Sequence, residues 1–211
     1  MTIKINTFDD MRSIINNLKI EHIGENKSTR KEELYLVLRL LSTDMKKINL
    51  TFPYIIEVKD KPDIRIIKDS YVIGIEITFA LNKTLQKAKK IRDKLNSSFL
   101  LEPSLYKDDM SAKDIKKTIL KSNEKLIGSA YVDDELEEEV SQQVLSSIKE
   151  KIKKYRGYEV FQENYLMLYS DILLADINVV LEKIDEGLKL INDIPFNKII
   201  FRLQNKNFFY S

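Results

Sequence analysis

The spacing of apolar residues changes period twice along this 211-residue chain, and that change constrains the fold more than any other feature. Before residue 42 the apolar positions recur at helical spacing. Three short runs rich in β-branched side chains then follow, Tyr54–Val58, Ile64–Lys68 and Tyr71–Thr78, with turn residues between them. Runs of this kind are typical of antiparallel strands joined by tight turns. The sequence therefore predicts a β-meander between helical regions.

Two helices are predicted before the meander. Residues 8–18 place apolar side chains three and four positions apart, and Asn6 or Thr7 can cap the first turn. Between Leu34 and Leu41 apolar side chains cover so much of the circumference that this helix is expected to be largely buried. The polar residues at 28, 29, 32 and 33 resemble a capping box, which gives the glutamates among them a structural explanation.

After the meander the helical period returns. The pattern predicts helices over 82–95 and 112–126, a long helix opened by acidic residues at 133–139 and closed by a lysine run at 149–156, a strand over 164–170, a helix over 176–191, a strand over 198–204, a turn at 205–207 and a strand over 208–210. A strand, helix, strand series implies a crossover connection and a partly parallel sheet. The expected fold class is α/β, with a mixed central β-sheet, antiparallel meander plus parallel crossover, flanked by α-helices.

Composition bounds the organisation and the chemistry of the chain. No Pro/Gly/Ser-rich linker interrupts it, so we expect a single domain over residues 1–211, with 1–27 as an N-terminal helical extension and 28–211 as the core. Cysteine is absent, which excludes disulfides, thiolate metal sites and a cysteine nucleophile. The one histidine, His22, makes neither a catalytic triad nor a closed zinc site. No apolar stretch has the length of a membrane span, so a cytoplasmic protein without a membrane partner is expected.

Charge and aromatic patterns leave the question of nucleic-acid binding open. The net charge is +2, so affinity for a polyanion has to come from local patches. Basic runs at 83–94 and 149–156 are candidates, and lysines on solvated helix faces explain them equally well. Tyr155, Tyr158, Phe161 and Tyr165 have the spacing either of base-stacking aromatics or of core residues.

The most specific feature lies in the meander. Asp63 precedes the second run, and Glu76 lies among isoleucines in the third. On neighbouring antiparallel strands the two carboxylates can converge beside the backbone carbonyl of Ile77. Three hard oxygen ligands with open water positions suit Mg²⁺ or Mn²⁺, and such an ion can activate water and neutralise charge on a phosphate. The competing interpretation is that Glu76 and Thr78 form the wet side of a half-exposed strand.

The segment at residues 61–78, KPDIRIIKDSYVIGIEIT, resembles the signature hairpin of the PD-(D/E)xK nuclease superfamily, the restriction endonuclease-like proteins. The later order of a helix ending KIKKYRGY, the strand NYLMLYS, a helix and the strand KIIFRLQ is also similar to this group. The resemblance implies a metal-dependent endonuclease acting on phosphodiester bonds, with DNA as the first candidate substrate. It implies that Asp63 and Glu76 hold the metal with the Ile77 carbonyl, and that Glu33, or else Glu32, completes the site.

The sequence departs from the family at one position. Where the family has a lysine that stabilises the transition state, this chain has Thr78, whose neutral hydroxyl cannot supply positive charge. A relocated lysine is the expected substitute, with Lys83 or Lys87 on the next helix and Lys151 or Lys154 on the long helix as candidates. The alternatives are a catalytically inactive nuclease-fold protein that binds nucleic acid or a protein partner, and an immunity-type partner protein. A homodimer is a further option.

Overall fold

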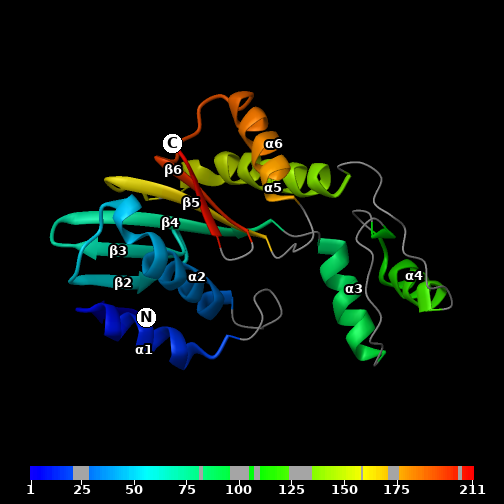
Figure 1. Ribbon diagram of the computed structural model, residues 1–211, viewed down its shortest axis with the longest axis horizontal. Helices are drawn as coiled ribbons and strands as arrows, with labels where there is room; N and C mark the ends of the chain where they lie inside the picture. Colours follow the sequence, from blue (N-terminus) through cyan, green and yellow to red (C-terminus); the bar gives the residue numbers. More distant parts are fainter. Residues whose placement is uncertain are drawn as a thin grey trace. The chain divides into compact units, whose positions relative to one another are not determined.

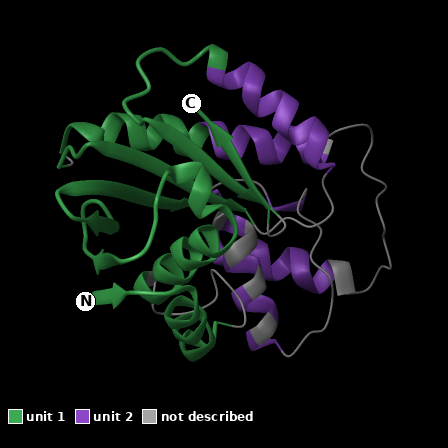
Figure 2. Ribbon diagram, turned by 60° about the vertical axis from the view of Figure 1, so that its left-hand side comes forward, with its two compact units in different colours: residues 1–79, 146–173, 189–211 green, residues 80–145, 174–188 purple. Residues whose placement is uncertain are grey.

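The computed structural model describes residues 1–20, 29–80, 83–95, 105–106, 110–123, 135–157, 159–170, 176–203 and 206–211. These residues belong to two compact units, which Figure 2 shows in green and purple. Unit 1 comprises Met1–Phe79, Ser146–Leu173 and Lys189–Ser211, and unit 2 comprises Ala80–Leu145 and Leu174–Leu188. The division concerns compactness, so the expectation of a single domain stays a prediction.

The helices and strands alternate in the manner of an α/β protein. In chain order they are β1 (Thr2–Ile5), α1 (Phe8–Leu18), α2 (Thr29–Asp44), the 3-10 helix η1 (Met45–Ile48), β2 (Tyr54–Val58), β3 (Ile64–Lys68), β4 (Tyr71–Phe79), α3 (Lys83–Lys94), α4 (Ala112–Asn123), α5 (Glu135–Lys154), the 3-10 helix η3 (Tyr155–Gly157), β5 (Glu163–Ser170), α6 (Ile177–Lys189), β6 (Lys198–Leu203) and β7 (Lys206–Tyr210).

All the strands of unit 1 belong to one seven-stranded sheet, whose order follows the chain from β1 to β7 (Figure 1). Strands β1 to β4 are antiparallel neighbours, β4, β5 and β6 are parallel, and β7 is antiparallel to β6. The meander and the partly parallel sheet are therefore confirmed. Helices α3 to α5 lie between β4 and β5 in the chain, and α6 lies between β5 and β6, as parallel neighbours require.

The main core of unit 1 lies where α1 and α2 cover one face of the sheet (Figure 1). The apolar residues expected to bury α2 do so: Leu34, Leu36, Val37, Leu38, Leu40 and Leu41 are at most 1% exposed. They pack against alternate residues of the strands, such as Ile73, Ile75 and Ile77 of β4. The other face of β4 therefore carries the intervening residues, Glu76 among them.

Helix α1 has the predicted bounds and a complete capping box. The Thr7 hydroxyl accepts the Asp10 N–H at 3.2 Å, while the Asp10 carboxylate accepts the N–H groups of Asn6 and Thr7. The same bonds lower the pKa of Asp10. Of the two caps considered from the sequence, Thr7 is the one used.

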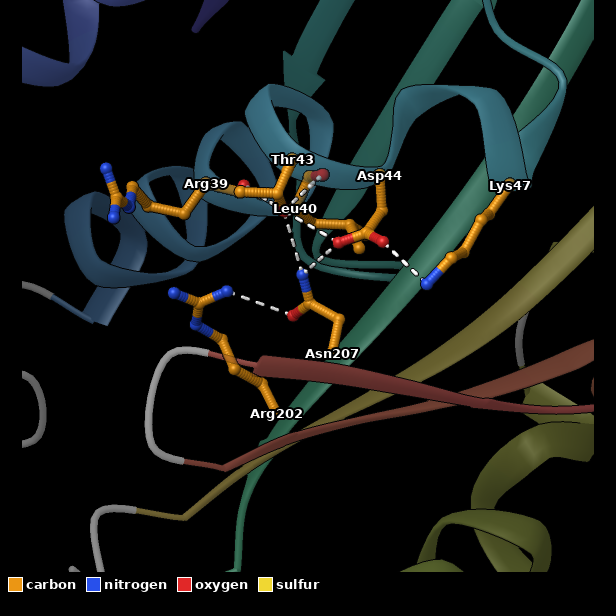
Figure 3. Close-up of polar contacts among 7 residues, drawn as sticks. All are labelled: Arg39, Leu40, Thr43, Asp44, Lys47, Arg202 and Asn207. Carbon is orange, nitrogen blue, oxygen red and sulfur yellow. Dashed lines mark hydrogen bonds and ion pairs between the residues drawn. The ribbon is translucent and has the colours of Figure 1, made fainter.

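The Asn207 side chain of the C-terminal hairpin forms polar contacts with α2, as Figure 3 shows. The Asn207 amide of β7 donates to Asp44 Oδ2 at 2.8 Å and to the Thr43 hydroxyl at 3.1 Å, and its carbonyl oxygen accepts from Arg202 at 3.0 Å. Lys47 holds the other oxygen of Asp44 at 2.8 Å. Arg202 is 2% exposed, and burial together with the nearby Arg39 lowers its pKa. Asn207 thus joins β6, β7 and α2 in one polar network.

Unit 2 contains a smaller core between α3 and α4. Its buried members are Ala88, Tyr106, Ile115 and Ile119. The first half of α5 packs against α6, where a Cβ at Gly187 would lie 2.2 Å from Leu145, so only glycine permits this approach. Lys183 and Glu138 form an ion pair between the two helices at 2.8 Å.

Three details differ from the sequence predictions. Strand β1 was not expected, because a four-residue run is too short to reveal a strand; it forms because β2 offers it a partner. The expected turn at 205–207 is wrong for Lys206 and Asn207, which belong to β7, where they pair with Leu203 and Arg202. The expected end of a helix at 191 is later than that of α6, whereas the expected end at 126 lies outside the described residues. His22, Tyr158, Asn205 and the start of the acidic block lie outside the described residues. No described helix combines the length and apolarity that a bilayer crossing needs.

Candidate functional site

The β3–β4 hairpin brings the two predicted acids together. Ile64 pairs with Ile75, so continuing the antiparallel register by one residue sets Asp63 opposite Glu76. Residues directly opposite in an antiparallel pair project from the same face. The meander therefore places both carboxyl groups on the face of the sheet that α1 and α2 do not cover, as the sequence interpretation required.

The Asp63 carboxylate accepts a hydrogen bond from the backbone of β4 at the point where β3 begins. The Ile77 N–H donates to Asp63 Oδ2 at 2.7 Å. In the continued register Ile77 would lie opposite Pro62, which precedes the strand. The carboxylate therefore acts as the acceptor where the ladder of backbone bonds has ended, and this bond sets the orientation of the Asp63 side chain.

Lys151 of α5 is the lysine that lies at this site. Its ammonium is 2.5 Å from Glu76 Oε1 and 3.3 Å from the carbonyl oxygen of Ile77. The Lys151 side chain is 19% exposed and the Glu76 side chain 6% exposed, so the pair is largely withdrawn from water. Breaking such a pair is costly, because one charge stays buried alone.

The acids of the site repel one another. Burial and the negative charge of Glu76 raise the pKa of Asp63 to about 7, with a smaller contribution from Glu33. The Ile77 N–H and the Lys151 ammonium act in the opposite direction. Burial and the charge of Glu76 also raise the pKa of Glu33 on α2. Negative charge is thus concentrated at this end of the hairpin, and a cation there lowers the electrostatic energy.

The other predicted site residues, Thr78, Glu33 and Glu32, lie on β4 and on α2. Thr78 is half-buried on β4, two residues beyond Glu76 and on the same face of the strand. Glu33 is half-buried on α2, and its neighbour Glu32 is 1% exposed. The expectation that Glu33 ligates the metal stays a prediction, since only its charge is seen to act on Asp63 and Glu76.

The lysine candidates are distinguished by their surroundings. Lys154 lies one turn beyond Lys151, is 64% exposed and pairs with Glu150 at 3.9 Å. Lys87 is exposed on α3 of unit 2. Lys83 begins the same helix, and its side chain lies outside the described part of the chain, so its predicted catalytic role is untested. Within unit 1, Lys151 is the candidate that contacts Glu76, and its charge also acts on Asp63.

The Phe161 ring lies against β4 at Gly74, two residues before Glu76 on the same face, and explains an otherwise unexplained glycine. A Cβ built on Gly74 would lie 2.8 Å from Phe161 Cδ2 and 3.1 Å from Pro62 Cγ. Arg65, which pairs with Gly74 across the hairpin, lies 5.0 Å from the centre of the Phe161 ring and forms an ion pair with Glu159. The absence of a side chain at position 74 therefore lets the aromatic ring lie directly on β4.

Gly74→Ala is expected to lower the free energy of unfolding by about 1–3 kcal/mol, because the added methyl overlaps the Phe161 ring. In a Phe161→Ala background, where the ring is absent, urea unfolding should show that Gly74→Ala lowers the free energy of unfolding much less. Gly157→Ala is the matched control, since a Cβ there meets nothing within 4 Å. Equal losses for the two glycine variants would contradict the contact.

The other aromatic candidates have structural surroundings. Tyr165 is 1% exposed and belongs to the main core, which favours the core interpretation. Tyr155 packs edge-on against Phe196 with the ring centres 5.0 Å apart. Phe161 is half-buried, and its ring lies at Gly74, two residues from Glu76 along β4.

A magnesium-type ion requires oxygen donors and compensating negative charge. Within the described ranges, no group of three or more His, Cys, Asp or Glu side chains is placed to hold a metal ion. Two carboxylates, those of Asp63 and Glu76, and the Ile77 carbonyl do meet here, and Mg²⁺ commonly takes one or two protein carboxylates and keeps several waters. In donor chemistry and in charge, the residues fit Mg²⁺ or Mn²⁺.

Comparisons with family models, curated proteins and solved structures find no match for this chain. The resemblance to PD-(D/E)xK nucleases therefore depends on the hairpin residues and the order of elements, and it enters the functional argument as a proposal.

Proposed function

We propose that this chain is a metal-dependent nuclease that hydrolyses phosphodiester bonds, with DNA as its substrate and a restriction endonuclease-like fold. One observation carries the proposal: Asp63, Glu76 and a lysine, Lys151, meet at one end of the β3–β4 hairpin. Two acids and one lysine are the charged groups that the PD-(D/E)xK signature combines. The order of α2, the β2–β4 meander and the parallel strand β5 supports the same assignment.

Each residue has a defined task in this proposal. Asp63 and Glu76 would hold Mg²⁺ or Mn²⁺ through carboxylate oxygens, with the Ile77 carbonyl as a third donor. The bound ion would supply an activated water and neutralise charge on a phosphate oxygen. Lys151 carries the positive charge that Thr78 lacks, and it replaces Lys83 as the lysine we assign to the site. A low dielectric around the half-buried ammonium strengthens its attraction for a phosphate.

A second candidate is a nuclease-fold protein without turnover that binds nucleic acid or a protein partner. The contacts that favour it are those that already engage the acids: Lys151 holds Glu76, and Asp63 accepts the Ile77 N–H. A buried polar group that already has partners can have a purely structural role. In that case the site stabilises the hairpin against α5 and holds no ion.

Purified protein incubated with supercoiled DNA, and separately with RNA, in Mg²⁺ or Mn²⁺ divides these candidates. We expect cleavage that falls by about a hundredfold or more in Asp63→Ala and in Glu76→Ala, the scale on which charged active-site groups act. Glu57→Ala is the matched control, because Glu57 is an acid of the same sheet that pairs with Lys59 at 3.5 Å.

Absence of cleavage together with a mobility shift that weakens steeply with salt would favour the inactive binder over the nuclease. Absence of both would favour a protein partner. Cleavage that is unchanged in both acid variants would contradict the assignment of the site.

A further inference from the structure

The Lys151 ammonium contacts two of the oxygen atoms assigned to the metal. Its Nζ lies 2.5 Å from Glu76 Oε1 and 3.3 Å from the Ile77 carbonyl oxygen. The ammonium is therefore a positive charge at the position where the donor set would otherwise hold a divalent ion. The protein has a cation of its own at this site.

Two cations that approach these oxygens from the same side compete for one position. Mg²⁺ binds oxygen at about 2.0–2.1 Å, which is closer than an ammonium hydrogen bond. An ion that binds Glu76 Oε1 and the Ile77 carbonyl from the side where Lys151 Nζ now lies would overlap the ammonium, and the two positive charges would repel each other strongly at so short a distance. Occupation of this position by one cation therefore requires the other to leave.

Lys151 is able to leave. Its side chain is more exposed than that of Glu76, 19% against 6%, whereas the carboxylate belongs to β4, a central strand of the sheet. The lysine stem is unbranched and has four rotatable methylene groups, so it can move its charge without moving α5. The acid is thus the stationary member of the pair and the lysine the movable one.

We propose that the Lys151 ammonium and a divalent cation are alternative occupants of the position bounded by Glu76 Oε1 and the Ile77 carbonyl, so that entry of the ion releases Lys151 toward an anionic group. This inference rests on the proposed function in taking the site to accept Mg²⁺ or Mn²⁺. It adds that Lys151 neutralises the charge of Glu76 when no metal is bound, and that the lysine becomes available to a phosphate when the metal is present.

Mn²⁺ binding to the full-length protein, measured by isothermal titration calorimetry and by the electron paramagnetic resonance of free Mn²⁺, tests the inference without reference to cleavage. Lys151→Gln removes the charge and keeps a donor for Glu76, and Lys151→Met is the second variant. Both should bind Mn²⁺ at least about tenfold more tightly than the wild type at one ion per chain, since a competing unit charge in contact is worth more than a tenfold change.

Lys153→Gln is the control, because it makes the same charge change two residues along the helix, on another face. It should leave Mn²⁺ affinity within about twofold, and Asp63→Ala should abolish the gain in the Lys151 variants. Thermal melts of each variant confirm that it is folded.

Equal or weaker Mn²⁺ binding in both Lys151 variants, with wild-type binding still dependent on Asp63, would overturn the inference and leave the proposed nuclease standing. A gain in the Mn²⁺ affinity of the Lys151 variants that depends on Asp63, without any cleavage of DNA or RNA, would support the inference and contradict the proposed nuclease activity. Absence of Asp63-dependent Mn²⁺ binding in every protein would overturn both.

Discussion

Asp63→Asn is expected to stabilise the metal-free protein at pH 8 by about 2–4 kcal/mol and to have little effect at pH 4. The pKa of Asp63 is raised from 3.8 to about 7, which is worth about 4 kcal/mol at 1.36 kcal/mol per unit. The other charged side chains of the site change their interactions after the substitution, so the expected gain in the free energy of unfolding is smaller than this value. An asparagine keeps an oxygen that accepts the Ile77 N–H.

The sign follows from proton linkage. The folded protein holds the Asp63 proton more tightly than the unfolded chain, so the stability due to this group is fully present below pH 3.8 and is lost as the pH rises through about 7. Asparagine does not titrate, so the difference between the variant and the wild type should grow over this window. Urea unfolding in buffers with EDTA from pH 4 to pH 8 measures it.

Added Mn²⁺ should make the wild type more stable than Asp63→Asn at pH 8. An ion that binds the folded wild type stabilises it by mass action, and the ion favours the ionised form of Asp63. The asparagine variant should gain much less. Glu57→Gln, an acid outside the site, is the control in both buffers. A stability difference between Asp63→Asn and the wild type that is the same at pH 4 and pH 8 would contradict the raised pKa.

Lys151→Met is expected to lower the free energy of unfolding by about 3 kcal/mol at neutral pH, because Glu76 is then a buried carboxylate without its ammonium. Glu76→Leu should cost less, since Lys151 can turn its charge toward water. The double variant Glu76→Leu/Lys151→Met should recover most of the loss, because a packed apolar pair replaces a buried ion pair at little cost.

A double-mutant cycle by urea unfolding gives the coupling free energy between the two residues. Lys154→Met is the matched control on the same helix; its pair with Glu150 is exposed, so a change within about 0.5 kcal/mol is expected. Additive losses for Lys151→Met and Glu76→Leu would show that the contact contributes nothing, and would also weaken the placement of Lys151 at the site.

Strand patterns in the sequence were sufficient to place the two acids. In β4 the isoleucines at 73, 75 and 77 alternate with Gly74 and Glu76, and that period of two decides which residues share a face. With a tight turn before Tyr71, the register of the hairpin follows, and Asp63 then lies opposite Glu76. The burial of α2 was predictable for a similar reason, because apolar residues occupy most of its circumference.

The identity of the lysine could not be predicted in this way. Lys151 and Lys154 lie on the same helix one turn apart, and helical period alone does not decide which of them faces a given strand. The contact joins residues 75 positions apart in the chain, so it depends on how α5 returns to the sheet. Gly74 likewise had no local explanation, since the ring that requires it comes from Phe161.

Local periodicity and turn chemistry thus determined strands β2 to β7, most of the helices, the buried face of α2 and the pairing of Asp63 with Glu76, because those features depend on residues close together in the chain. The Lys151 contact, the raised pKa of Asp63, the edge strand β1 and the Asn207 link to α2 were decided by tertiary structure. Each of these depends on distances and burial between segments far apart in sequence, and a one-dimensional pattern contains no such distances.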